Sequence, residues 1–582
     1  MVIHRARFVY ILRDLPCPSC VFIPDLIESF DLMADSALIM QSDASILLDT
    51  HAENFEEVRS ALLPFAELVK SPEHFHIYRI TALSVWNAAA CGITLEYIEE
   101  ILKRYSRYDI PENVLKQIEQ HYARYGLLIL EQSEDKGEEW LFLSQSGRDS
   151  ILQEISSHPK IKKMLIPHEE GFLVNWQYRG TLKQELINLG WPVEDRVPLK
   201  LGEPLPMALN KDWNLRSYQE SAMRSFLGDL GAGTGFGVIA LPCGSGKTIV
   251  AMAVMAALQT ETLILTANTS SSRQWKRELL EKTTLQEEQI GEYSSSMKEI
   301  RAVTLATYQI LIWRANKEEE FQHFGLFKQR AWGLVIYDEA HLLPAPVFRV
   351  TAELQTIRRL GLTATLVRED GAEKDIFSLI GPKRFDIPWL DLEKQGFIAR
   401  AYCFEVHIEL SADDDLMYVV AEKNKKTRIA ATNPRKLEIT QKILSRHPDE
   451  PTLIIGQYID QLHAFAKAFD APIITGKTAA GERDRLYAAF REGEIRLLIV
   501  SKVANFSIDL PDASVAVQIS GSFGSRQEEA QRLGRILRPK NRPSYFYSLV
   551  SLMTVEEEFA SHRHKFLTEQ GYHYQIVKES EL

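Results

Sequence analysis

The sequence predicts an α/β protein with two tandem parallel-sheet domains, preceded by α+β amino-terminal modules. Three observations support this prediction. The chain has 582 residues, too many for one hydrophobic core. Short apolar runs alternate with helical patterns over 216–400, and again after residue 435. The first 215 residues lack this regular alternation. We therefore expect about four structural units.

Five apolar runs in the first series are expected to be buried strands, because each is short and bounded by turn or polar residues. They are FGVIA (236–240), TLILTA (262–267), AVTLA (302–306), GLVIY (333–337) and RLGLTA (359–364). Helical patterns at 248–259 and 272–282 lie in the intervals. The series predicts one doubly wound domain at 206–400.

A second series of apolar runs predicts another domain of the same kind at 435–582. Its strand candidates are TLIIG (452–456), APIIT (471–475), RLLIV (496–500) and SVAVQIS (514–520). The charged segment 411–434 matches neither sheet pattern. We assign residues 401–434 to a linker or a small helical insertion.

The amino-terminal part contains three helical patterns at 77–125, followed by strand candidates at 127–132 and 140–145 around a polar turn. This order resembles a winged helix with a β-hairpin wing. A helical docking module without DNA contact is an equal alternative. We expect an extension at 1–35, a domain at 36–145 and a mixed α/β module at 146–205, which ends in a proline-marked boundary.

Composition excludes several classes of protein. No uncharged apolar run approaches the ~20 residues that a membrane span needs. Five cysteines are few and odd in number, which favours a reducing cytoplasm. Cys17 and Cys20 form a CxxC without a second pair, so a metal or redox site there is disfavoured. The net charge of −12 argues against a surface coated with basic residues, but it leaves a confined basic channel open.

The segment LPCGSGKT (241–248) follows a predicted strand and opens a predicted helix. Its glycines let backbone N–H groups turn inward around phosphate oxygens, although Leu241 stands where the standard motif has glycine. Lys247 is expected to reach the β and γ phosphates of ATP, and Thr248 to hold Mg²⁺. The nucleotide-binding residues that this loop predicts are Gly244, Ser245, Gly246, Lys247 and Thr248.

The segment GLVIYDEAH puts Asp338 and Glu339 directly after a buried strand, at the edge where ligands bind in parallel sheets. Asp338 is suited to hold Mg²⁺, and Glu339 to orient or deprotonate the attacking water. An isolated Asp-Glu pair at a strand end is more often a helix-start signal. The upstream phosphate loop favours the catalytic interpretation.

The segment 525–540 carries Gln531, Arg532, Arg535 and Arg538 at helical spacing, so that several lie on one face. Alone, such a segment is typically a solvated basic helix. A phosphate-cleaving site, however, needs a cation that arrives from a second domain, and such an arginine accelerates hydrolysis by ~10³ to 10⁵. We expect Arg535 and Arg538 to be these arginine fingers.

These three motifs, in this order on tandem domains, resemble those of superfamily 2 helicases and translocases. Further segments resemble the XPB family of DNA-repair and promoter-opening helicases, especially its prokaryotic, bacterial members. The triplet Arg368, Glu369 and Asp370 matches that family's RED motif, although three charges after a strand are usually a solvated loop. The other segments are RSYQ (216–219), TANTSSSRQW (266–275), ATYQ (306–309), GLTATLVREDG (361–371), SKVANFSIDLP (501–511) and GSRQEEAQRLGRILR (524–538).

The resemblance implies two RecA-like domains and roles for particular residues. Arg216 and Gln219 would read adenine, Asp509 would approach the nucleotide sugar, and Gln531 would join the two arginine fingers around the γ phosphate. Residues 36–145 would be an XPB-type amino-terminal domain, 146–205 a damage-recognition-like domain and 401–434 a thumb-like element. Residues implied in coupling hydrolysis to motion or in DNA contact are His341, Thr363, Thr365, Arg368, Glu369, Asp370 and Arg532.

The function expected from the motifs and the resemblance is that of an ATP- and Mg²⁺-dependent 3′–5′ DNA helicase in DNA repair, including nucleotide excision repair. Its expected partners are forked, single-stranded or damaged duplex DNA and a repair nuclease, with no membrane, in the cytoplasm. Two alternatives remain open at this stage. One is a double-strand DNA translocase that does not separate strands, and the other is a DNA-binding assembly factor that uses ATP as a switch.

Overall fold

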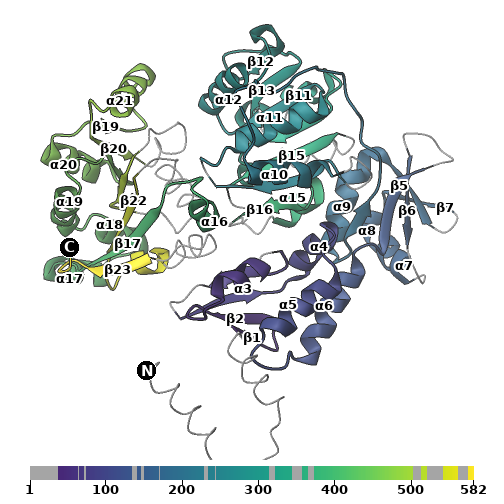
Figure 1. Ribbon diagram of the computed structural model, residues 1–582, viewed down its shortest axis with the longest axis horizontal. Helices are drawn as coiled ribbons and strands as arrows, with labels where there is room; N and C mark the ends of the chain where they lie inside the picture. The colour runs from purple at the N-terminus through teal and green to yellow at the C-terminus, as the bar shows by residue number, and fades with distance from the viewer. Residues whose placement is uncertain are drawn as a thin grey trace, which may run out of the picture.

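The chain folds into two seven-stranded sheets, one five-stranded sheet and one four-stranded sheet within the described residues. In Figure 1 the first seven-stranded sheet lies at the top, the second at the left, the five-stranded sheet at the right and the four-stranded sheet below. The computed structural model describes residues 37–62, 64–70, 74–133, 140–145, 150–168, 171–228, 234–242, 244–313, 322–343, 357–364, 373–387, 389–501, 513–520, 542–560 and 574–582.

The first seven-stranded sheet is parallel throughout, with the order β12-β13-β11-β14-β15-β10-β16. Each of the five strands predicted here is present within one residue of its expected start. β12 and β16 were not predicted, because IGEY and KRFD are short and carry charged residues. The strands are β10 (Phe236–Ala240), β11 (Thr262–Thr266), β12 (Ile290–Tyr293), β13 (Val303–Thr307), β14 (Leu334–Tyr337), β15 (Arg358–Thr363) and β16 (Lys383–Asp386).

The second seven-stranded sheet is also parallel, with the order β19-β20-β18-β21-β22-β17-β23. When the strands of each sheet are numbered from its own first strand, both sheets have the order 3-4-2-5-6-1-7. The prediction of tandem RecA-like parallel-sheet domains is confirmed. The strands are β17 (Ala401–Ile408), β18 (Thr452–Gly456), β19 (Ile473–Ile474), β20 (Leu497–Ser501), β21 (Val515–Gln518), β22 (Ser544–Ser551) and β23 (Tyr574–Lys578).

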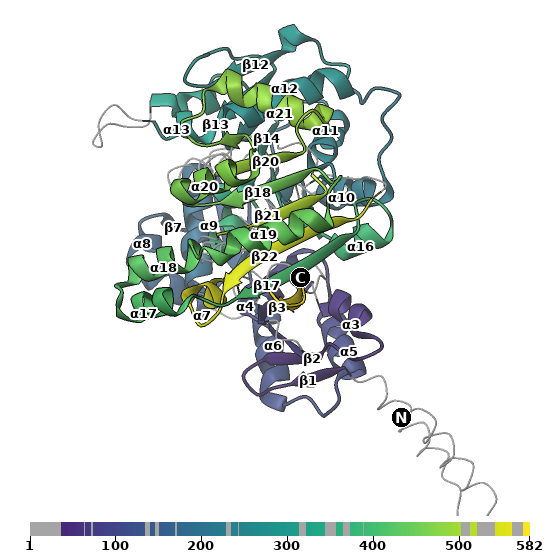
Figure 2. The same cartoon turned by 90° about the vertical axis from the view of Figure 1, so that its left-hand side faces the viewer.

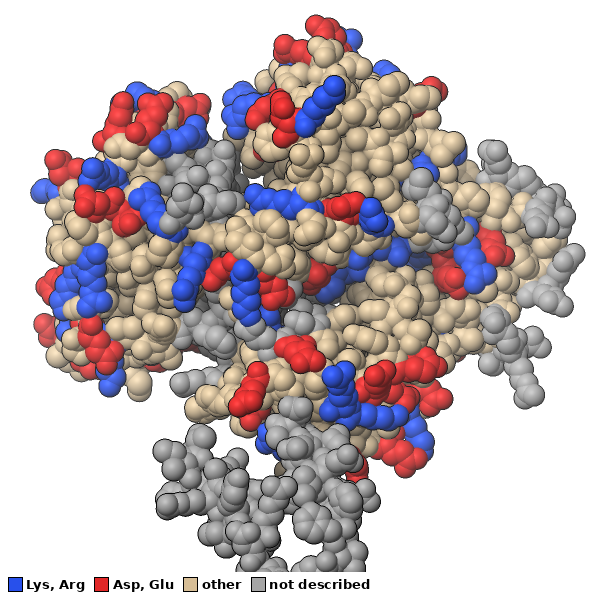
Figure 3. Space-filling model, in the orientation of Figure 1, with Lys and Arg blue, Asp and Glu red and all other residues tan. Residues whose placement is uncertain are grey.

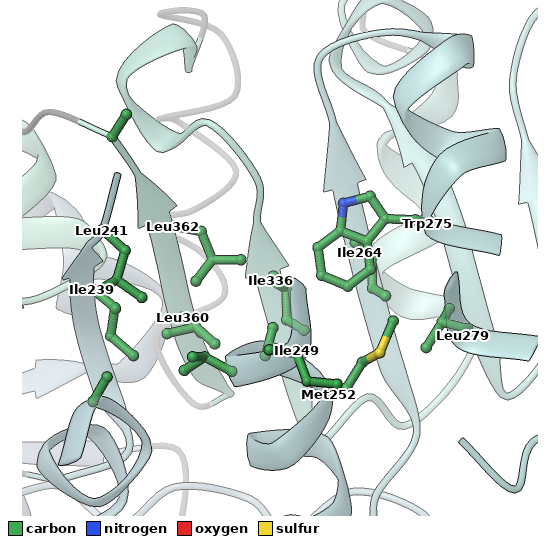
Figure 4. Packing of buried hydrophobic residues seen from close by; sticks show 14 of the residues in the cluster. Ile239, Leu241, Ile249, Met252, Ile264, Trp275, Leu279, Ile336, Leu360 and Leu362 are labelled. Atoms are coloured by element: carbon green, nitrogen blue, oxygen red, sulfur yellow. The ribbon is translucent and has the colours of Figure 1, made fainter. Parts of the chain in front are cut away.

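Helices cover both faces of these sheets. In β10, Ile239 belongs to the apolar cluster that also contains residues of α10, α11 and α12 (Figure 4), whereas Val238 belongs to a second apolar cluster. α19 and α20 cover one face of the second sheet (Figure 2). The helices are α10 (Ser217–Leu227), α11 (Lys247–Leu258), α12 (Thr269–Lys282), α13 (Tyr308–Leu311), α15 (Glu373–Leu379), α16 (Trp389–Lys394), α17 (Ala412–Val420), α18 (Lys423–Ala431), α19 (Arg435–Arg446), α20 (Ile459–Phe469) and α21 (Ala480–Glu492).

The amino-terminal domain combines an antiparallel sheet, in the order β1-β2-β4-β3, with the three helices expected at 77–125. The sheet itself was not predicted. Its elements are β1 (Leu38–Met40), β2 (Ser45–Asp49), α3 (Phe55–Leu62), β3 (Glu67–Lys70), β4 (Phe75–Arg79), α4 (Ala82–Ala90), α5 (Leu95–Tyr105) and α6 (Glu112–Arg124).

The hairpin expected to be a wing is part of a different sheet. β5 and β6 pair in antiparallel register as predicted, but they lie inside the five-stranded sheet β7-β8-β6-β5-β9. The winged-helix interpretation and the boundary at 145/146 are therefore corrected, because residues 140–143 of β6 also pair with β8. This module contains β5 (Leu128–Gln132), β6 (Trp140–Gln145), α7 (Ser150–Ser157), α8 (Pro159–Lys162), β7 (Leu165–His168), β8 (Gly171–Asn175), α9 (Arg179–Asn188) and β9 (Val193–Asp195).

The expected start of the second parallel domain also differs from the structure. We expected this domain to begin at residue 435, but β17 pairs with both β22 and β23 and so belongs to its sheet. Only α17 and α18 separate β17 from α19. Among the described helices, none combines the length and apolar character that crossing a membrane requires.

Candidate active site

The phosphate loop connects β10 to α11, as the sequence predicts. Gly244 and Gly246 have φ angles of 79° and 85°, in the left-handed region that glycine adopts without a steric cost. A Cβ atom at Gly246 would lie 2.6 Å from Nε2 of Gln219. Both glycines are therefore required by the shape of the loop.

Two side chains of α10 donate hydrogen bonds to the backbone of this loop. The hydroxyl of Tyr218 donates to the carbonyl oxygen of Ser245 at 2.5 Å, and Nε2 of Gln219 donates to the same oxygen at 2.9 Å. Gln219 Oε1 accepts from the backbone N–H of Arg216 at 2.9 Å. The guanidinium of Arg216 lies 5.1 Å from the ring centre of Phe397. Gln219 thus positions the phosphate loop in this structure, and adenine reading by Arg216 and Gln219 stays a prediction.

Lys247 is the first residue of α11, and Thr248 follows it. The Nζ of Lys247 lies 3.3 Å from the carbonyl oxygen of Leu241 and 3.4 Å from that of Pro242. Its ammonium therefore stands across the loop at the positive end of a helix. An anion seated on Gly244–Gly246 would meet both the helix N–H groups and this charge.

Asp338 and Glu339 follow β14 at the carboxyl end of the sheet. The backbone N–H of Asp338 donates to the carbonyl oxygen of Leu265 at 2.9 Å. Burial and the adjacent Glu339 raise the pKa of Asp338 to about 7, while Trp275 and Lys247 oppose this shift. Two adjacent carboxyl groups are suitable ligands for a divalent cation, because the positive charge of the cation would stabilise the ionised form of each.

His341 and Thr363 connect this segment to β15. Nδ1 of His341 lies 2.8 Å from Oγ1 of Thr363, and both side chains are buried. The same nitrogen lies 3.5 Å from Oε2 of Glu339. The carbonyl oxygen of Thr363 accepts from the backbone N–H of Leu241 at 3.0 Å. Thr363 therefore contacts both the segment that follows β14 and Leu241, the first residue of the predicted phosphate loop.

Two residues of this site were missed by the sequence reasoning. Nε1 of Trp275 donates to Oδ2 of Asp338 at 2.9 Å, and the hydroxyl of Tyr308 donates to the carbonyl oxygen of Asp338 at 2.9 Å. Both lie in segments, TANTSSSRQW and ATYQ, that were used only to identify the family resemblance. Their residue types could have indicated such contacts, because a buried Trp or Tyr normally has a hydrogen-bond partner.

Several predicted residues lie outside the described residues, and their roles stay predictions. Cys17 and Cys20 also lie outside them. Within the described residues, no group of three or more His, Cys, Asp or Glu is arranged to hold a metal ion. The predicted site residues outside the described ranges are Thr365, Arg368, Glu369, Asp370, Asp509, Gln531, Arg532, Arg535 and Arg538.

Comparisons with known proteins cover most of the chain. The family model described as ERCC3/RAD25/XPB C-terminal helicase matches residues 392–582. A helicase conserved C-terminal domain model matches residues 38–170, and a model of the res subunit of type III restriction enzymes matches residues 212–368.

Three curated relatives align over nearly their full lengths. A DNA 3′-5′ helicase XPB of Kineococcus radiotolerans is 49% identical over 94% of this chain and 98% of its own. That of Mycobacterium tuberculosis is 49% identical over 94% of this chain and 99% of its own. The XPB subunit of general transcription and DNA repair factor IIH from Enterocytozoon bieneusi is 32% identical over 93% of each chain.

Proposed function

The chain belongs to the XPB family of helicases, and we propose that it is an ATP-driven DNA helicase that moves 3′ to 5′ and acts in DNA repair. One observation carries the proposal. The carboxyl ends of three neighbouring strands of the first sheet bring together Lys247, the Asp338–Glu339 pair and the His341–Thr363 contact. In a parallel sheet, this edge is where ligands bind.

Each residue at this edge of the sheet would have a separate role in ATP hydrolysis. Lys247 and the amino-terminal N–H groups of α11 would bind the phosphates of ATP, and Thr248 and Asp338 would hold Mg²⁺. Bound magnesium supplies positive charge that neutralises the phosphate oxygens. Glu339 would orient the attacking water and accept its proton. Arg535 and Arg538 would complete the site from the second domain, with Gln531 beside them.

DNA would lie across the two parallel-sheet domains and be held mainly by its phosphates, since a motor must move along any sequence. Figure 3 shows Lys and Arg side chains, interspersed with Asp and Glu, across the middle of one face. Because the net charge is −12, we expect the positive charge that binds DNA to be confined to one part of the surface. Binding should weaken as salt is added.

The remaining parts of the proposal follow from the family. The five-stranded module would sense distorted DNA, and the α17–α18 hairpin would act as a thumb. A repair nuclease would cut beside the opened strand, and the complex would work in the cytoplasm. Thr365, the RED triplet, Asp509 and Arg532 would contribute to coupling, fork contact and nucleotide binding.

Substitution of Glu339 tests the catalytic part of this proposal. Glu339→Gln should lower the DNA-stimulated ATPase rate at least ~10²-fold while ATP binding persists, because the amide cannot accept a proton. Glu288→Gln is the control, since Glu288 is an exposed acid of the same domain. ATP turnover and nucleotide binding should be measured together. Hydrolysis unchanged by Glu339→Gln would contradict the assignment.

A double-strand translocase is a second candidate, favoured by the match of residues 212–368 to a restriction-enzyme subunit. Strand displacement on a forked duplex and displacement of a triplex-forming strand would distinguish the two functions. A helicase should release the duplex strand. A translocase should release only the triplex strand, and that result would overturn the helicase assignment.

A further inference from the structure

Trp275 joins the apolar core to the catalytic carboxylate. Its ring packs in the cluster that includes Ile264 and Leu279, and its indole nitrogen is directed away from that cluster (Figure 4). The Nε1–H donates to Oδ2 of Asp338 at 2.9 Å. An indole nitrogen can only donate, so the packed ring sets the direction from which this carboxylate oxygen is held.

Helix α12 is itself held close to the sheet at its first turn. Oδ1 of the N-cap residue Asn268 accepts from the backbone N–H of Ser271 at 3.0 Å. The hydroxyl of Ser272 lies 2.7 Å from that of Thr266, the last residue of β11. These contacts restrain the first turn of α12, which directly precedes Trp275. The indole is therefore a rigid donor rather than a side chain that follows the carboxylate.

Tyr308 holds the same residue from another element. It begins α13, and its hydroxyl donates to the backbone carbonyl oxygen of Asp338 at 2.9 Å. A phenol hydroxyl donates one hydrogen bond, which here goes to the main chain of Asp338. Two elements restrain both the side chain and the main chain of Asp338.

We propose that Trp275 and Tyr308 are positioning residues that keep the carboxylate of Asp338 oriented to bind magnesium. This inference rests on the proposed function, in which Asp338 holds the ion. Oδ1 of Asp338 accepts from the backbone N–H of Glu339 at 3.1 Å, and the indole N–H of Trp275 fixes the other oxygen, Oδ2. Outer hydrogen bonds of this kind orient metal ligands, and their loss lowers metal affinity or activity by ~10 to 100-fold.

The test compares Trp275→Phe with Trp332→Phe in the full-length protein bound to DNA. Trp332 is another buried tryptophan of the same domain, and its Nε1 donates to the carbonyl oxygen of Leu326 at 3.2 Å. Binding of Mn²⁺ in place of Mg²⁺ is measured by paramagnetic resonance with a non-hydrolysable ATP analogue, and ATPase rates are measured against free Mg²⁺ at fixed ATP. Trp275→Phe should raise the half-saturating Mg²⁺ concentration about tenfold, and excess Mg²⁺ should restore part of kcat. Trp332→Phe should stay within about twofold of the unchanged protein.

A second variant decides the matter if Trp275→Phe does not fold. Tyr308→Phe removes one oxygen and should raise the Mg²⁺ requirement in the same direction. Its control is Tyr293→Phe, which loses a 2.9 Å contact with His323 in the same domain. The inference is overturned if the folded variants of Trp275 and Tyr308 need no more Mg²⁺ than their controls.

Asp338→Asn separates this inference from the proposed function. If Asp338→Asn keeps its ATPase activity, the proposed function itself fails. If Asp338→Asn abolishes hydrolysis while the Trp275 and Tyr308 variants behave like their controls, only the positioning inference fails.

Discussion

At the scale of single residues, the contact between His341 and Thr363 links the segment that follows β14 to β15. The hydroxyl of Thr363 contacts His341, and its carbonyl oxygen accepts from the backbone N–H of Leu241. The family resemblance implied a role for Thr363 in coupling hydrolysis to motion. The structure adds a physical reason for a coupling role, because a single buried residue contacts both halves of the site.

Thr363→Val removes the hydroxyl but keeps the size of the side chain. We expect the ratio of DNA-stimulated to basal ATPase rates to fall about tenfold, since a lost hydrogen bond of ~1 to 1.5 kcal/mol frees the imidazole of His341 to turn. Thr304→Val is the matched control, because the Thr304 hydroxyl also donates inside the same domain, to the carbonyl oxygen of Arg301. An equal change in both variants would argue against coupling through Thr363.

At the scale of elements, the start of β14 shows how closely the chain segments approach beneath the site. Gly333 precedes β14, and its backbone N–H donates to the carbonyl oxygen of Glu261 at 3.0 Å. A Cβ atom at Gly333 would collide with the side chain of Thr260 and the backbone oxygen of Leu201. Asp338 directly follows β14, so its placement depends on the close packing at Gly333, for which the sequence assigned no role.

Gly333→Ala should therefore destabilise the first parallel-sheet domain by ~1 to 3 kcal/mol, the usual effect of overpacking. Gly325→Ala is the control, since a Cβ atom at Gly325 would have nothing within 4 Å. Thermal unfolding of the two variants should be compared under one set of conditions. A melting temperature that is equal in both would show that the backbone at Gly333 can move aside.

At the scale of the whole molecule, a buried charge cluster joins the five-stranded module to the first parallel-sheet domain. Asp195 accepts from Arg179 at 2.7 and 3.0 Å and from Lys183 at 2.8 Å. Lys183 of this module and Arg359 of the first parallel-sheet domain lie 5.8 and 5.3 Å from the ring centre of Phe236 in β10. Burial and Arg179 lower the pKa of Arg359 to about 10.

Asp195→Asn should destabilise the protein by ~3 to 5 kcal/mol, because it leaves Arg179 and Lys183 buried without their counter-charge. The exposed pair of Glu131 and Arg196, 3.5 Å apart, provides the control, and Glu131→Gln should cost ~0 to 1 kcal/mol. Thermal unfolding at pH 7 measures both effects.

The contribution of Asp195 should also depend on pH. Burial alone would raise the pKa of Asp195, but Arg179 and Lys183 hold it well below its usual value. A depressed carboxyl pKa stabilises the folded state above the unfolded pKa of ~4, and this stabilisation disappears as the pH falls towards the folded pKa. The difference between Asp195→Asn and the unchanged protein should therefore be full at pH 7 and shrink below pH ~4.

The sequence by itself determined the features that local chemistry encodes. Apolar runs such as FGVIA predicted the central strands, because burial on both faces requires continuous hydrophobicity. The glycines and Lys247 of LPCGSGKT, and Asp338 with Glu339, predicted a nucleotide site, since phosphate binding needs these groups at fixed spacing. Both are short-range patterns, so they can be recognised in the sequence without knowledge of the fold.

Only the tertiary structure decided which distant segments meet. β17 joins the second sheet, and the β5–β6 hairpin joins the five-stranded sheet, because strand pairing depends on partners far away in the chain. Trp275 and Tyr308 reach Asp338 for the same reason, since the order of the strands brings their helices to one edge. Hydrogen-bond partners separated by 63 and 30 residues leave no periodic trace in the sequence, so their pairing becomes visible only in the folded chain.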